Sequence, residues 1–97
     1  MEEIIKAAMA DKKLVEFSYS GHIRIAEPHV LGVTGGTTQI LGYQVGGSSS
    51  SGGIPEWRRF DLSKISGLKP LLQSFAGPRP FPSGQHSTWD YQIAVVV

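Results

Sequence analysis

Apolar and polar residues alternate along much of the chain, which is typical of strands with one buried face. The clearest case is the segment Leu14–Ser20, where Val15, Phe17 and Tyr19 occupy every second position. Successive side chains of a strand point to opposite sides of the sheet. The pattern therefore predicts a half-buried strand with these three residues on the core side.

Four further strands follow from the same reasoning, at Ile23–Val33, Thr38–Val45, Glu56–Phe60 and Ile65–Leu71. In the first of these, Ile23 and Ile25 are predicted to point inward, and Pro28 marks a bulge or a sharp bend. In the second, Leu41, Tyr43 and Val45 share one side. The segment Asp61–Lys64 suits a single helical turn before the last strand.

The amino-terminal segment Glu2–Ala10 has helical spacing instead. Ile4, Ile5, Ala8 and Met9 share one face, and acidic residues stand at the favourable end of the helix dipole. So short a helix is not stable alone in water. We therefore expect it to pack on the strands as a lid.

These elements predict a mainly β fold: a small SH3/Sm-like five-stranded bent antiparallel barrel from Leu14 to Leu68, with a short N-terminal helix and a C-terminal extension strand. Residues 1–72 would form the barrel domain. Residues 73–97 would form a Pro-rich linker and a strand that packs on the barrel or on a second subunit.

Two segments depart from the alternation. The Gly/Ser tract Gly46–Gly53 cannot bury apolar surface and is predicted to be mobile. The segment Gly77–Gly84 carries three prolines in five positions and favours extended, polyproline-type backbone. Beyond it, Trp89–Val97 alternates again and predicts a sixth strand, paired with the barrel edge or with another copy of the chain.

The composition limits the kinds of partner that the chain can attract. The chain has 97 residues, nine Lys and Arg against eight Asp and Glu, and no cysteine. A net charge of +1 gives no general attraction for polyanions, so such a site would need local clustering of basic residues. There is no signal-peptide pattern and no apolar run long enough to cross a membrane. We therefore expect a cytoplasmic protein without a membrane partner.

The order of short motifs resembles the WYL domain family over roughly residues 4–68. The matching residues are Val15, Phe17, Tyr19, Arg24, Glu27-Pro28-His29, Leu41-Gly42-Tyr43 and the run from Arg58 to Ile65. The family's Trp-Tyr-Leu signature is replaced here by Gln39-Ile40-Leu41, so the chain would be a divergent, stand-alone member. The resemblance implies an SH3/Sm-like barrel, a ligand-sensing role in transcription regulation, and a basic, aromatic-lined groove for nucleic acid or nucleotides, without enzymatic activity.

Seven residues are candidates for that groove: Tyr19, Arg24, Tyr43, Trp57, Arg58, Arg59 and Lys64. Arg58 and Arg59 are adjacent in a strand and must point to opposite faces, with Arg58 on the side of Phe60. An arginine could hold a phosphate by bidentate contact, and Trp57 could stack on a base. The alternative is that Trp57 covers an apolar patch and the arginines are solvated or paired with Glu56 and Asp61.

Residues for catalysis or metal binding do not cluster. The histidines His22, His29 and His86 are scattered without ligand spacing, and no carboxylate pair is apparent. We therefore expect neither an enzyme, nor a metal site, nor a cofactor.

Two functions stay open. The first is a ligand-binding regulatory module for single-stranded nucleic acid or a nucleotide, acting on a separate regulatory protein. The second is a protein-interaction or homo-oligomerisation module, most simply a homodimer formed through the last strand.

Overall fold

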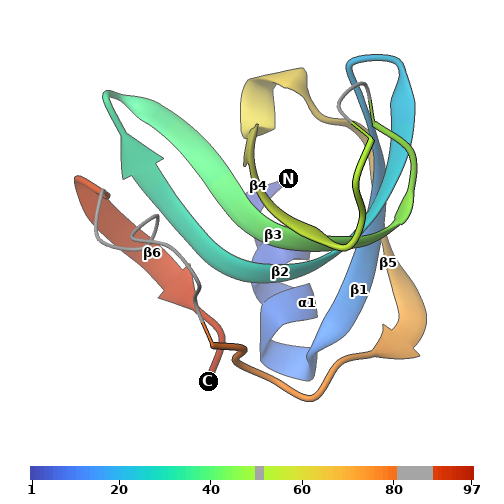
Figure 1. Ribbon diagram of the computed structural model, residues 1–97. Coiled ribbons are helices and arrows are strands. Elements are labelled where there is room, and N and C mark those ends of the chain that lie inside the picture. The colour runs from blue at the N-terminus through green and yellow to red at the C-terminus, as the bar shows by residue number, and fades with distance from the viewer. Residues whose placement is uncertain (50–51, 81–88) are drawn as a thin grey trace.

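A computed structural model describes residues 1–49, 52–80 and 89–97. Within these ranges, one α-helix precedes six strands that form one antiparallel sheet (Figure 1). The elements are α1 (Glu2–Asp11), β1 (Lys13–Tyr19), β2 (His22–Thr34), β3 (Thr37–Gly47), β4 (Glu56–Asp61), the 3-10 turn η1 (Leu62–Lys64), β5 (Ser66–Ser74) and β6 (Tyr91–Val95).

The predicted fold class is confirmed: the described chain is mainly β, with an N-terminal helix, a strongly bent sheet and an extension strand. The strand order is β4-β3-β2-β1-β5, so β4 and β5 lie at opposite ends and the bent sheet does not close. The long strands β2 and β3 curve across the whole molecule in Figure 1. The pairing of β2 with β3 is irregular between Pro28 and Val30, which is where the proline predicted a bend.

The core lies between the bent sheet and α1. Val15 and Phe17 of β1 are buried as predicted, and the rings of Phe17 and Phe60 meet edge to face at 4.9 Å. The helix contributes Ile5, Ala8 and Met9, while Ile4 is 40% exposed. Ile4 was expected on the buried face, but the face that contacts the sheet is narrower than the predicted one.

The predicted orientation of β2 was wrong at its start. Ile23 is 52% exposed and Ile25 is only half-buried, whereas Arg24 and Ala26 are buried. The pairing of β1 with β2 explains this, because Phe17 lies opposite Arg24 and Val15 lies opposite Ala26. Directly opposed residues share a face of the sheet, so the core side of β1 brings an arginine inward.

The carboxyl-terminal strand pairs within the same chain. β6 runs antiparallel to the second half of β2, and an ideal Cβ added to Gly32 would lie 2.6 Å from the Trp89 ring.

The prediction for Gly46–Gly53 falls partly on residues 50–51, and that for Gly77–Gly84 partly on residues 81–84, both outside the described residues. In the part that is described, no helix has the length and apolarity needed to span a bilayer.

Candidate functional site

Six of the seven predicted site residues lie on the two faces of the sheet, and the seventh, Lys64, lies apart on η1. Alternation along β4 puts Arg58 and Phe60 on the core side and Trp57 and Arg59 on the outer side, as predicted. Arg58 lies opposite Gly42, where an added Cβ would meet Ala26 and Phe60 of the core. The structure therefore does not bring the seven residues into one groove.

The inner group is Tyr19, Arg24 and Arg58, at one end of the core. The side chain of Arg24 is nearly buried, with the residue 5% exposed. Its guanidinium donates from Nη2 and Nε to the carbonyl oxygen of Tyr19, at 3.1 and 3.4 Å, and from Nη1 to Oε1 of Gln44 at 3.3 Å. It also lies over the rings of Tyr19 and Phe60, at 5.6 and 5.7 Å from their centroids.

These partners of Arg24 are all neutral. Among the described residues, no carboxylate comes within ion-pair distance of its guanidinium. Burial, and secondarily the charge of Arg58, lower the pKa of Arg24 below the ordinary arginine value. The positive charges of Arg24 and Arg58 therefore repel each other at the inner end of the sheet. Burial strengthens this repulsion, because water screens buried charges poorly.

Hydrogen bonds at the solvent-exposed edge of the inner group hold the side chain of Arg58. Its Nη2 donates to Glu56 Oε2, to Ser49 Oγ at 3.1 Å and to the carbonyl oxygen of Gly52 at 3.2 Å. The Glu56 side chain is half-exposed. The carboxylate of Glu56, which accepts this hydrogen bond from Arg58, therefore lies at the solvent edge.

The ring of Tyr19 packs against core residues and does not offer a free face to a ligand. Its ring packs against Phe17 and Phe60, at 6.4 and 5.0 Å between centroids. Its hydroxyl accepts a hydrogen bond from the backbone N–H of Asp61 at 3.1 Å. A base could not stack on this ring without displacing core residues, so any recognition at the inner group would be electrostatic.

The outer group is Tyr43, Trp57 and Arg59, all half-buried. The rings of Tyr43 and Trp57 lie 5.0 Å apart. The guanidinium of Arg59 lies 3.8 Å above the Trp89 ring and donates from Nη1 to Oγ1 of Thr34 at 3.1 Å. Burial lowers the pKa of Arg59.

Lys64 belongs to neither group. It is exposed on η1 and lies 3.6 Å from Asp61 Oδ2. A loose ion pair of this kind, between an exposed lysine and a half-buried carboxylate at the surface, contributes little to stability.

A third cluster was missed from the sequence. Glu27 and His29 are both buried, with Glu27 Oε1 3.0 Å from His29 Nε2. Arg79 donates to the same carboxylate from Nε at 2.7 Å and from Nη2 at 2.9 Å. Its guanidinium lies 4.4 Å from the centroid of the Tyr43 ring, and the Trp57 ring meets His29 at 4.8 Å.

The charges of this cluster are coupled. Burial opposes ionisation of Glu27, but hydrogen bonds from Arg79 and His29 outweigh it and lower the pKa of the carboxyl group. Burial also lowers the pKa of His29, although Glu27 acts in the opposite direction. The only sequence signal was a Glu and a His on either side of Pro28, and nothing in it pointed to an arginine 52 positions away.

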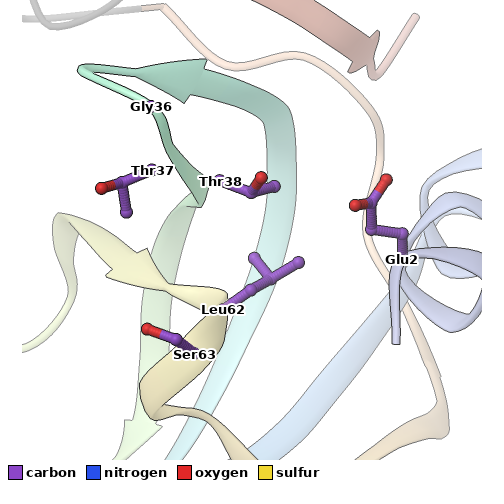
Figure 2. A pocket seen from close by; sticks show the side chains of 6 residues that line it. All are labelled: Glu2, Gly36, Thr37, Thr38, Leu62 and Ser63. Carbon is purple, nitrogen blue, oxygen red and sulfur yellow. The ribbon is translucent and has the colours of Figure 1, made fainter.

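The structure also contains an open pocket of about 340 Å³, lined by Glu2, Gly36, Thr37, Thr38, Leu62 and Ser63 (Figure 2). It lies between α1, the β2–β3 turn and η1, and includes none of the seven predicted residues. Its one ionisable side chain is a carboxylate, which repels anions. This pocket therefore does not suit the ligand class expected from the sequence.

In the described ranges, no three His, Asp or Glu side chains gather to hold a metal ion. Comparison with protein-family models, curated proteins and solved structures gives no match. The resemblance to the WYL domain therefore stays a prediction, and the case for a function depends on the geometry above.

Proposed function

We propose that this chain is a non-enzymatic ligand-binding module that takes a phosphate-bearing ligand, a nucleotide or a single strand of nucleic acid, at the inner end of the sheet beside Arg24 and Arg58. In this role it would act as a regulatory module on a separate partner protein. The ligand class was expected from the sequence, and the geometry of the inner group supports Arg24 and Arg58 as the pair that would hold it.

The observation that carries the proposal is a buried arginine with neutral acceptors next to a second arginine on the same face. Burying a cation is costly unless an anion accompanies it. Arg24 is 5% exposed, and the charge of Arg58 adds to the effect of burial in lowering its pKa. An anionic ligand would offset both the burial of the Arg24 charge and its repulsion by Arg58, because it would interact favourably with both guanidinium groups.

The rim around Arg58 offers a route for exchange. Glu56 and the carbonyl oxygens of Gly52 and Gly53 now accept hydrogen bonds from Arg58. A phosphate group accepts the same hydrogen bonds with more charge, and arginine holds it in a planar fork. Phosphate could therefore replace these acceptors without a change in the β strands.

The test is a fluorescence-polarisation titration of the full chain with labelled single-stranded DNA, single-stranded RNA and cyclic nucleotides at two salt concentrations. Arg58→Ala is compared with Arg59→Ala, which removes the same charge one position further on but from the opposite face. Lys69→Ala, on β5, is a second control for net charge. Circular dichroism checks that each variant is folded.

Binding should weaken with salt, with log K falling by about 0.7 per phosphate contact for each tenfold rise in salt. Loss of one charged hydrogen-bond donor should weaken binding by roughly ten- to a hundredfold in Arg58→Ala. Arg59→Ala and Lys69→Ala should stay close to wild type. Equal losses in the two arginine variants, or none, would show that the inner pair is not the site.

A second candidate function is protein interaction, favoured by one exposed apolar residue. Leu72 on β5 is 94% exposed, and β5 is at one end of the strand order. An open strand edge with an apolar side chain is a common docking surface. Light scattering of wild type beside Leu72→Glu tests it: self-association lost in the variant supports this function, and a monomeric wild type removes homo-oligomerisation.

A further inference from the structure

The outer face contains a second built site, opposite in charge to the inner pair and independent of the proposed function. We propose that Glu27, with the ring of Tyr43 beside it, is a receptor for an arginine side chain, which Arg79 fills in the isolated chain and which an arginine of a second polypeptide can occupy instead.

The receptor has the two features that select a guanidinium. The first is a carboxylate that accepts two hydrogen bonds from one fork, from Arg79 Nε at 2.7 Å and Nη2 at 2.9 Å. The second is an aromatic ring 4.4 Å from the guanidinium carbon. Lysine can satisfy the charge but not the planar fork, so this geometry favours arginine.

The receptor side is rigid and preformed. Glu27 is 4% exposed and His29 is fully buried, both on β2, and Tyr43 lies directly opposite Glu27 on β3. His29 Nε2 lies 3.0 Å from Glu27 Oε1 and fixes the carboxylate from behind. The Trp57 ring contacts both His29 and Tyr43. A carboxylate fixed in this way retains its position when the arginine leaves.

The occupant, in contrast, belongs to a segment outside the helix and strands. Residues 78–80 are exposed, and the side chain of Arg79 itself is 44% exposed. The preceding Gly77 is buried close to Lys12 and Val97. The chain is therefore packed just before Arg79, and among the described residues Arg79 is held by its guanidinium, through Glu27 and the Tyr43 ring. This arrangement allows another arginine to compete for the same carboxylate.

The partner that fits is an extended segment with an arginine between small or proline residues, as in the chain's own Gly77-Pro-Arg-Pro80. Flanking prolines keep such a segment extended and reduce the conformational entropy lost on binding. An anionic segment would be repelled by the receptor carboxylate.

The experiment uses the full chain with Arg79→Ala, which leaves the receptor intact and empties it. The probe is the peptide acetyl-Gly-Pro-Arg-Pro-amide, followed by NMR on the Trp57 indole N–H. Two control peptides carry lysine or citrulline in place of arginine; citrulline has the same shape without the charge. A second protein variant, Arg79→Ala with Glu27→Gln, removes the carboxylate charge.

The arginine peptide should bind Arg79→Ala saturably, and the citrulline peptide about tenfold or more weakly, the loss expected for charged hydrogen bonds. The lysine peptide should fall between them. Wild type should bind the arginine peptide more weakly than Arg79→Ala, because Arg79 competes at high effective concentration. Equal binding of the three peptides, or undiminished binding after Glu27→Gln, would overturn the proposal.

If Arg79→Ala does not fold, the wild-type chain provides the test. The Arg79 Nε–H resonance, protected by its hydrogen bond to Glu27, is followed while the arginine peptide is added to concentrations on the order of 10 mM. Progressive loss of that protection with the arginine peptide and not with the citrulline peptide supports the receptor. An unchanged resonance with both peptides counts against it. Neither result depends on whether the inner pair binds phosphate.

Discussion

Replacing Arg24 by methionine separates a structural role of this arginine from a binding role. The methionine side chain follows the same path as the arginine stem but carries no charge. The substitution removes the hydrogen bonds to the Tyr19 carbonyl oxygen and to Gln44, at 3.1 to 3.4 Å, together with two distant ring contacts.

The expected magnitude follows from the terms that oppose each other. Hydrogen bonds from a charged donor contribute about 1.5 kcal/mol each at the lower end of their range, which suits these long contacts. Two acceptors and two ring contacts of about 0.5 kcal/mol each give a loss of about 4 kcal/mol. Against this loss, the uncharged methionine avoids the cost of removing the arginine charge from water, which is several kcal/mol. The free energy of unfolding should therefore stay within about 1 kcal/mol of wild type.

The assay is urea unfolding followed by tryptophan fluorescence, in the absence and presence of inorganic pyrophosphate. A ligand at ten times its dissociation constant stabilises the folded state by about 1.4 kcal/mol. Pyrophosphate should stabilise wild type and leave Arg24→Met unaffected. Arg24→Ala is the matched control for packing: it loses the same hydrogen bonds as Arg24→Met and in addition leaves a cavity, so it should be about 2 to 4 kcal/mol less stable than Arg24→Met.

Arg24→Met would refute the reasoning if it lost more than about 2 kcal/mol, the cost of removing a net stabilising buried group. Arg24 would then be a structural residue whose hydrogen bonds outweigh its desolvation. Equal stabilisation of wild type and Arg24→Met by pyrophosphate would show instead that the anion binds elsewhere.

Other predictions concern the outer face and β6. Burial lowers the pKa of His29, so below pH 6.5 the unfolded chain binds a proton that the folded chain does not. The free energy of unfolding should therefore be constant above pH 6.5 and fall below it. Urea midpoints measured against pH should show this fall in wild type and not in His29→Gln. Below about pH 4.5 a second loss should follow, because the pKa of Glu27 is also lowered in the fold. Gly32→Ala should destabilise by about 1 to 3 kcal/mol in the same assay, because the new methyl group would clash with Trp89. Gly42→Ala, where the new Cβ meets ordinary contact distances, should change stability by less than about 1 kcal/mol.

The faces of β1 and β4 were predictable because their side chains alternate between the core and the outer face of the sheet. Val15 and Phe17 face inward, and Arg58 and Arg59 point to opposite faces, as the period of two requires. The start of β2 was not predictable from its own pattern, because the isoleucines there are the more apolar residues. Its orientation is set by pairing with β1, which puts Arg24 opposite Phe17, a tertiary fact that local hydrophobicity does not contain.

The candidate site was partly predictable. Arg24, Arg58 and Tyr19 were identified from motif order, and they do lie together on one face. The receptor formed by Glu27 and Tyr43 could not be foreseen, because its partner Arg79 lies in a proline-rich segment without periodic signal. A contact between residues 52 positions apart depends on how the segment after β5 returns across the sheet, which local sequence does not specify.

The most direct test of the central claim is NMR of the guanidinium Nε–H groups during a titration with inorganic pyrophosphate and then with a short single-stranded oligonucleotide. The resonances of Arg24 and Arg58 should shift together and saturate at the same ligand concentration, while those of Arg59 and Arg79 stay in place. Shifts confined to Arg59 or Arg79, or no saturable shift in Arg24 and Arg58, would contradict a phosphate site at the inner end of the sheet.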